Sequence, residues 1–368
     1  MSPSTLHQFI KFSTDAYGLE RTLRFLQSLT QLFLSYPSLP LAFLPFLGFP
    51  AEKIPRALSP AKKLTLTQLK SRLSLGRRYF RLFRFLESFS QAFDKYIEAA
   101  AKSRVERGGK TTGGKSKAGA GLAVGLVLGG IGVEKWMEIG SKGLNGVYYC
   151  AETATFVDEL RVEGLGVWGR ELAGRVMREG NRMWFFALVL AVVAGVGKVV
   201  GLGGEIARTR REVRHLEREV RRERGAVGGV LVEQPPPPGP PGPPTQGGGR
   251  SKGGAAAAGW EEQQQRWREQ EMRLERVRVG EAKLEELRVK LEKLLDTRYK
   301  AGRRAVADLL DMAVPGKAVG WVPFSTGVVS ALMLGSTWLT GLEVWEKCGE
   351  SVAKSAAKGE AKAKPKSE

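Results

Sequence analysis

The sequence predicts an all-α, membrane-associated protein with amphipathic helices, one or two candidate transmembrane helices and low-complexity linkers. Apolar residues recur at spacings of three and four through much of the 368-residue chain, as they do on one face of a helix. Residues 183–204 and 318–342 are long apolar segments that contain almost no charge. Stretches rich in glycine or proline separate the helical regions.

The formal net charge of +20 indicates polyanionic partners, either nucleic acid or the phosphates of a membrane surface. The sequence has no zinc-ligand spacing, no aromatic RNA-binding strand motif and no basic region before a long heptad array. A soluble nucleic-acid binder is therefore a weak alternative, and we expect no nucleic-acid partner. Cys150 and Cys348 form no CxxC motif, and His7 and His215 are the only histidines. We expect no metal site, no cofactor and no catalytic residues.

The N-terminal region, residues 1–107, is predicted to hold two amphipathic helices. Residues 5–35 are predicted to be helical with a possible break at Gly18, and from Leu19 on apolar and polar residues separate onto two faces. Prolines punctuate residues 36–60, so we expect an apolar loop there that packs on protein or dips into lipid. The second helix follows at residues 64–96.

Residues 64–96 combine an aromatic face with a cationic stripe, and this helix is predicted to bind a membrane surface. Eight cations lie between Lys62 and Arg84, whereas no acid lies between Ile54 and Leu86. At about 100° per residue, the cationic stripe and the main apolar residues fall on opposite sides. Such a helix suits an anionic lipid surface, where each lysine or arginine contributes ~1 kcal/mol. The alternative is a bundle helix with a solvated cationic face.

Residues 108–121 form a flexible tract of glycine, lysine, threonine and serine. Within this tract, residues 109–116 match the phosphate-binding loop pattern GxxxxGK[ST] at every specified position. That loop joins a strand to a helix in a parallel sheet, whereas the residues before this match are predicted to end a helix. We therefore interpret the match as a product of low complexity and predict no ATP turnover and no enzyme activity.

The remaining chain divides at a linker rich in proline, glycine and alanine. Small residues recur every four positions in both candidate spans, which allows close helix packing in lipid. Before the second span, Val277, Leu284, Leu287, Leu291 and Leu294 form a seam that predicts a helix pair, within the protein or in a dimer. The expected packing residues are Ala187, Ala191, Gly195, Gly327, Ala331 and Gly335. We predict a middle helical region at residues 122–224, which contains the span 183–204, followed by the linker at 225–259. The region 260–347 then holds a charged helix and the span 318–342, and residues 348–368 form a Lys/Ala-rich tail.

Several stretches carry a resemblance to one family. Residues 6–34, 64–93 and 324–345 resemble the N-terminal, central and C-terminal helices of the peroxin-11 family of peroxisomal membrane proteins. Residues 148–199 are similar to the middle region of that family, and residues 303–313 (RRAVADLLDMA) to the stretch before its last span. The Gly/Lys tract and the long proline linker depart from the family pattern, as in an expanded fungal-type member.

The resemblance implies a peroxisomal membrane protein with cytosolic termini that elongates the membrane and promotes proliferation and fission of peroxisomes. It implies as partners anionic lipids, further copies of the chain, and fission machinery with a tail-anchored adaptor and a dynamin-related GTPase. The alternative is an oligomeric pore or metabolite channel, although the spans offer few polar residues for a lumen. By the resemblance, Lys70, Arg77, Arg78, Arg81 and Arg84 contact lipid phosphates. The expected membrane-inserting residues are Leu75, Tyr79, Phe80, Leu82, Phe83, Leu86, Phe89 and Phe93.

Overall fold

A computed structural model describes residues 3–39, 59–108, 132–160, 162, 164–228 and 253–363. These residues form helices and connecting turns without a strand, which confirms the all-α prediction. Outside the described residues lie most of the predicted Gly/Lys tract with its phosphate-loop match, most of the proline loop and the centre of the linker.

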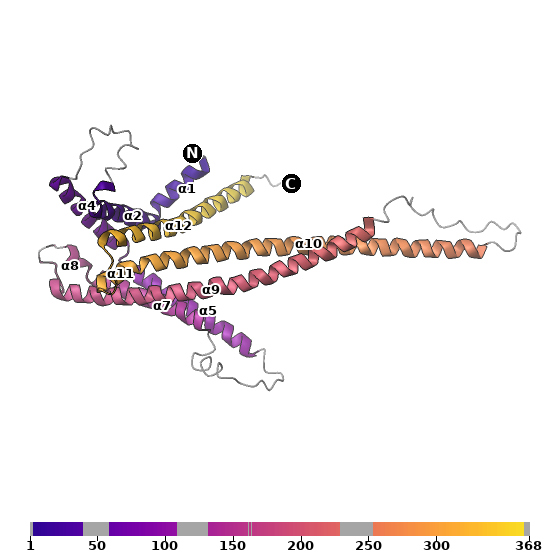
Figure 1. The fold of residues 1–368 in the computed structure, drawn as a ribbon, viewed down its shortest axis with the longest axis horizontal. Coiled ribbons are helices and arrows are strands. Elements are labelled where there is room, and N and C mark those ends of the chain that lie inside the picture. The colour runs from indigo at the N-terminus through magenta and orange to yellow at the C-terminus, as the bar shows by residue number, and fades with distance from the viewer. Residues whose placement is uncertain are drawn as a thin grey trace. The chain divides into compact units, whose positions relative to one another are not determined.

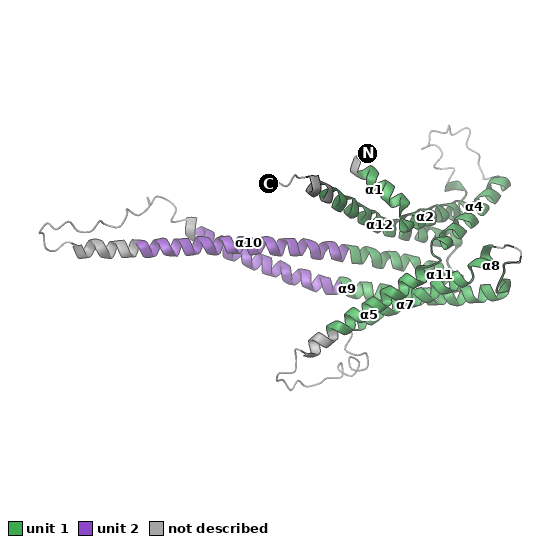
Figure 2. Cartoon of the chain, turned by 180° about the vertical axis from the view of Figure 1, so that it is seen from behind, with its two compact units in different colours: residues 1–199, 300–368 green, residues 200–299 purple. Residues whose placement is uncertain are grey.

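The chain divides into two compact units (Figure 2). Unit 1 comprises residues 1–199 and 300–368, and unit 2 comprises residues 200–299. Within unit 1, α2 packs against α4 and α12, α1 packs against α12, and α5 packs against α7. The helices, labelled in Figure 1, are α1 Pro3–Thr14, α2 Ala16–Ser35, α4 Pro60–Tyr79, α5 Arg84–Gly108, α7 Val133–Ala154, α8 Phe156–Leu160, α9 Gly169–Gly228, α10 Gly253–Asp311, α11 Ala313–Val319 and α12 Thr326–Ala363.

The predicted first helix is divided at Asp15 into α1 and α2. The side chain of Asp15 accepts hydrogen bonds from the backbone N–H groups of Tyr17 at 2.8 Å and Gly18 at 3.1 Å, which caps α2. A Cβ atom at Gly18 would lie 1.9 Å from the carbonyl oxygen of Phe12. Glycine is therefore needed beside the break, although the break itself precedes Gly18.

The predicted helix 64–96 is two helices, α4 and α5, separated by a turn at residues 80–83. In this turn, the N–H groups of Leu82 and Leu86 donate to carbonyls three residues earlier instead of four. The hydroxyl of Thr153 on α7 donates to the carbonyl oxygen of Leu82 at 2.8 Å. This bond satisfies a carbonyl that a continuous helix would have paired with Leu86, so contact with α7 stabilises the turn.

The predicted span 318–342 is also interrupted. Gly320 ends α11 with a φ of +86°, a conformation that favours glycine. The N–H groups of Trp321 and Val322 donate to the carbonyl of Gly316 at 2.9 and 3.2 Å, and α12 begins at Thr326. Among the described residues, two stretches are long and apolar enough to cross a membrane, Gly169–Gly225 and Thr326–Ala357.

Unit 2 consists of the C-terminal part of α9 and of α10 up to residue 299, which run antiparallel (Figure 2). Arg288 donates to Glu217 at 2.8 Å, and a Cβ atom at Gly280 would lie 2.7 Å from Cγ2 of Val220. The seam on α10 that the sequence predicts therefore pairs with α9 of the same chain. Leu284 is buried, and the other seam residues are half-buried.

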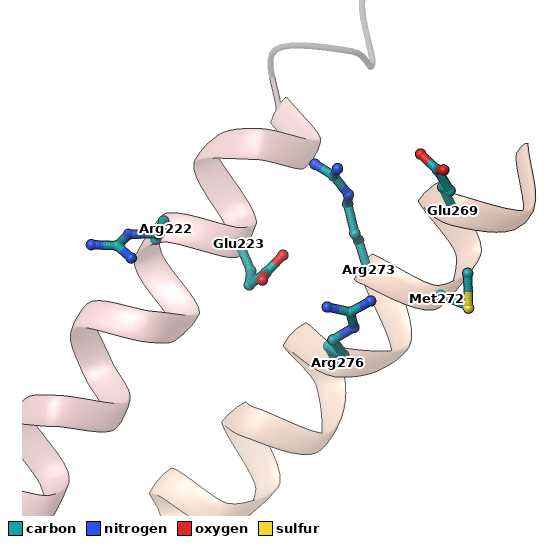
Figure 3. A pocket seen from close by; sticks show the side chains of 6 residues that line it. All are labelled: Arg222, Glu223, Glu269, Met272, Arg273 and Arg276. Carbon is teal, nitrogen blue, oxygen red and sulfur yellow. The ribbon is translucent and has the colours of Figure 1, made fainter. Parts of the chain in front are cut away.

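A charged pocket lies in unit 2 between α9 and α10. Figure 3 shows Arg273 and Arg276 of α10 on the side that faces Glu223 of α9. The residues that line it are Arg222, Glu223, Glu269, Met272, Arg273 and Arg276. The lining contains both arginines and glutamates, so the pocket presents no uniform charge to a ligand.

Candidate functional site

The interior of unit 1 holds a cluster of charged side chains. Glu20 of α2 is 2% exposed, and Arg77 and Arg81 are 7% and 8% exposed. Four guanidinium groups surround the Glu20 carboxylate: Arg84 Nη1 lies at 3.5 Å, Arg21 Nε and Arg77 Nε at 3.7 Å, and Arg81 Nε at 3.9 Å. We call Arg21, Arg77, Arg81 and Arg84 the Glu20 cradle.

Glu152 of α7 is a second buried carboxylate, and it binds arginines of the same cationic stripe that Glu20 binds. Arg81 Nη2 donates to Glu152 Oε1 at 2.8 Å, and Arg78 Nε lies 3.8 Å from that oxygen. Arg77 Nη1 donates to the side-chain oxygen of Gln27 on α2 at 2.6 Å. The arginines that follow one another along α4 and the turn are thus fixed between α2 and α7.

The electrostatic environment keeps the two central groups charged. Burial alone would raise the pKa of Glu20, but the cradle outweighs burial, with Arg21 contributing most, and lowers the pKa well below its usual range. Burial likewise opposes the charged form of Arg81, but Glu152 raises the pKa of that guanidinium. Both groups therefore remain ionised at neutral pH, as buried ion pairs require.

The structure gathers three of the five predicted phosphate-contacting cations, Arg77, Arg81 and Arg84, around Glu20. Arg78 lies 3.8 Å from Glu152 and 3.7 Å from Glu159, and Lys70 is half-buried earlier on α4. Contact with lipid phosphates stays a prediction for these cations. For Arg77 and Arg81 such contact requires the ion pairs to open.

Sequence reasoning missed Glu20 and Glu152 because they are far from the arginines along the chain. One signal was available for Glu20, which is an acid beside Arg21 and Arg24 on the polar face of a helix. Glu152 offered no comparable signal, since its arginine partners, Arg78 and Arg81, lie on α4 and in the turn at residues 80–83.

Apolar side chains are exposed at the end of the turn at residues 80–83 and along one side of α5. Phe83, Leu86, Phe93 and Ile97 recur at helical spacing, and all four are exposed. We call these four residues the apolar ridge. The opposite side of α5 packs against α7, where Ser88 and Ala99 are buried.

The other predicted membrane-inserting residues divide into two groups. Tyr79 and Phe80 are exposed, whereas Leu75 and Leu82 are half-buried. Phe89 is partly exposed, but its ring lies against α7, since a Cβ atom at Gly146 would be 2.7 Å from Phe89 Cε1. The exposed residues lie around the turn at 80–83 and along α5.

The small residues predicted to pack in the first span, Ala187, Ala191 and Gly195, lie on α9. Ala187 is buried and Ala191 is half-buried. A Cβ atom at Gly195 would lie 3.0 Å from the Cβ atom and 3.6 Å from the Cα atom of Ala305 on α10. Gly195 thus permits a close helix contact inside unit 1.

The small residues predicted to pack on α12 differ in their burial. Gly327 is buried, and a Cβ atom there would lie 2.3 Å from the Tyr36 ring. Gly335 is half-buried, and a Cβ atom there would lie 3.5 Å from Leu310 Cδ1. Ala331, in contrast, is exposed. The close contacts of α12 at Gly327 and Gly335 are therefore made within the chain.

Four hydroxyl groups of the second span lie inside unit 1, whereas Ser325 and Thr326 are exposed. Ser330, Ser336, Thr337 and Thr340 are buried, and each donates to a carbonyl of its own helix. These hydroxyls face protein in this structure instead of a lumen. Among the described residues, no three His, Cys, Asp or Glu side chains gather in a way that would hold a metal ion.

The family model described as Peroxisomal biogenesis factor 11 (PEX11) matches residues 253–345, which comprise α10, α11 and the first half of α12. No curated protein and no solved structure matches the chain.

Proposed function

Because the chain belongs to the PEX11 family, whose members act in peroxisome biogenesis and proliferation, we propose that it remodels the peroxisomal membrane by inserting the apolar ridge into one leaflet. The proposal extends to elongation of the organelle before fission. It includes anionic lipids and further copies of the chain as partners, and recruitment of a tail-anchored adaptor and a dynamin-related GTPase. Both termini lie in the cytosol in this proposal.

The exposure of the apolar ridge is the observation that supports this proposal most directly. Phe83 is 74% exposed, Phe93 62% and Leu86 58%. Large apolar side chains that are grouped on one face mark an interaction surface, because each would gain free energy on leaving water.

Exposed cations on α4 favour a membrane as the partner. Lys62, Lys63 and Arg72 of α4 are exposed, and α4 contains no acid. Cations at the surface are attracted to anionic headgroups, while an apolar helix face enters the boundary between headgroups and acyl chains. Insertion to a depth of about 5–10 Å expands one leaflet and not the other, which bends the membrane.

The test is a double substitution, Phe83→Ser with Phe93→Ser, assayed for tubulation of anionic vesicles by the full-length protein. We expect loss of tubulation with an unchanged helical circular dichroism spectrum, because both side chains contact little of the protein. Met272→Ser with Val279→Ser is the matched control, since these apolar side chains are similarly exposed in unit 2. Tubulation that survives the loss of Phe83 and Phe93 would contradict the proposal.

A further inference from the structure

The Glu20 carboxylate leaves the donors around it incompletely paired. Its contacts with the four guanidinium groups of the cradle measure 3.5 to 3.9 Å, which is longer than usual for charge-assisted hydrogen bonds. The Nε atoms of Arg21 and Arg77 are buried and have no hydrogen-bond partner among the described residues. A carboxylate has two oxygens, which are too few for donors that converge from four directions.

The charges are unbalanced as well. Four cradle arginines face Glu20, and Arg81 alone also binds Glu152. Excess positive charge in a buried site is costly unless an anion neutralises it. A phosphate group carries up to two charges and three or four acceptor oxygens, and guanidinium groups bind it through paired hydrogen bonds.

We propose that the cradle is a phosphate-binding site in which the Glu20 carboxylate occupies the place of the phosphate. The ligand is a phosphate group with one or no ester bond, either the phosphomonoester headgroup of a lipid or free phosphate, that displaces Glu20. This inference deepens the proposed function and rests on it for the lipid as the source of the phosphate.

The edge of the cradle through which phosphate enters is set by Arg21 and Arg84. Their side chains are 15% and 13% exposed, whereas those of Arg77 and Arg81 are 8% and 9% exposed. A phosphate group meets the outer pair first and reaches the inner pair as Glu20 withdraws. Arg81 remains held by Glu152 throughout, which keeps the inner wall of the site in place.

Glu20 acts in this account as an internal competitor, so its removal strengthens phosphate binding. The experiment uses the full-length protein in detergent and measures thermal unfolding in potassium phosphate against potassium chloride of equal ionic strength. We expect Glu20→Gln to melt below the wild-type protein in chloride and to be restabilised by phosphate. Its half-saturating phosphate concentration should be at least tenfold lower than that of the wild type.

Two variants control this measurement. Glu171→Gln removes the same charge from an exposed position on α9 and should respond to phosphate as the wild type does. Adding Arg84→Gln to Glu20→Gln should abolish the stabilisation by phosphate. The proposal is wrong if phosphate stabilises the Glu20→Gln protein no more than chloride does. It is also wrong if this variant fails to fold at every phosphate concentration.

Vesicle sedimentation distinguishes the two sources of phosphate. Glu20→Gln should bind vesicles with phosphatidic acid, a phosphomonoester, more tightly than vesicles of equal surface charge with phosphatidylserine. A response to free phosphate without this preference supports the site and assigns it to soluble phosphate. Phe83→Ser with Phe93→Ser should retain the phosphate response in detergent. The experiments therefore distinguish a ridge that does not insert into the membrane from a cradle that does not bind phosphate.

Discussion

Arg24 of α2 forms a buried ion pair with Asp311, the last residue of α10. The hydroxyl of Ser336 on α12 donates to the same carboxylate oxygen. One carboxylate thus joins an N-terminal helix to the two long helices that carry the family match. Through this contact the N-terminal helices, which carry the cradle and the ridge, are tied to the part of the chain that the family model describes.

Asp311→Ala should destabilise the protein strongly. The substitution leaves Arg24 buried without its partner, and breaking a buried ion pair in this way costs about 3–5 kcal/mol. Denaturant unfolding followed by helical circular dichroism measures the loss. Replacing both residues, as Arg24→Met with Asp311→Leu, removes the stranded charge and should recover most of the stability. A single substitution that changes stability by less than about 0.5 kcal/mol would show that the pair is not buried as described.

Gly195→Leu should separate α9 from α10 within unit 1. The new side chain would meet Ala305 at its Cα and Cβ atoms, and inserting atoms into such a contact costs about 1–3 kcal/mol. Gly197→Leu is the matched control, because no atom lies within 4 Å of a Cβ atom built there. The control should be neutral or slightly stabilising, since leucine favours helix more than glycine does. Equal effects on thermal unfolding at both positions would argue against the close contact.

Glu20 should make the stability of unit 1 sensitive to strong acid. The cradle lowers the folded-state pKa of Glu20, so its contribution to stability is fully present above the unfolded pKa of about 4.3. That contribution is lost as the pH falls below this value towards the folded-state pKa. Unfolding curves between neutral pH and strong acid should show a smaller pH dependence for Glu20→Gln than for wild type. Equal pH dependence would mean that Glu20 is not held by the four arginines.

Local patterns made the helices and the exposed ridge predictable, because a helical period is visible in neighbouring residues. Phe83, Leu86 and Phe93 were expected on the apolar face, and all three are exposed, Phe83 in the turn and the other two on α5. Gly320 and Pro323 are residue types that interrupt helices, and they indicate the break between α11 and α12. The absence of charge in residues 318–342 favoured one continuous span instead.

Features that depend on distant residues were not predictable in this way. The turn between α4 and α5 contains neither glycine nor proline, and Thr153, which satisfies its free carbonyl, lies 71 residues from Leu82. The cationic stripe has the spacing of a lipid-binding face, yet Glu20 and Glu152 bind its arginines inside the protein. A charge pattern on one helix does not reveal an acid that another helix brings to it.

The depth of Phe93 in a bilayer shows whether the apolar ridge inserts into one leaflet. A single cysteine at position 93, in a chain whose Cys150 and Cys348 are replaced by alanine, carries an environment-sensitive fluorophore, and a cysteine at position 272 serves as the reference. On anionic vesicles, we expect nitroxides on the lipid acyl chains to quench the label at position 93 strongly and the label at position 272 weakly. Equal quenching at both positions, or strong quenching of position 93 by aqueous iodide, would contradict insertion of the apolar ridge.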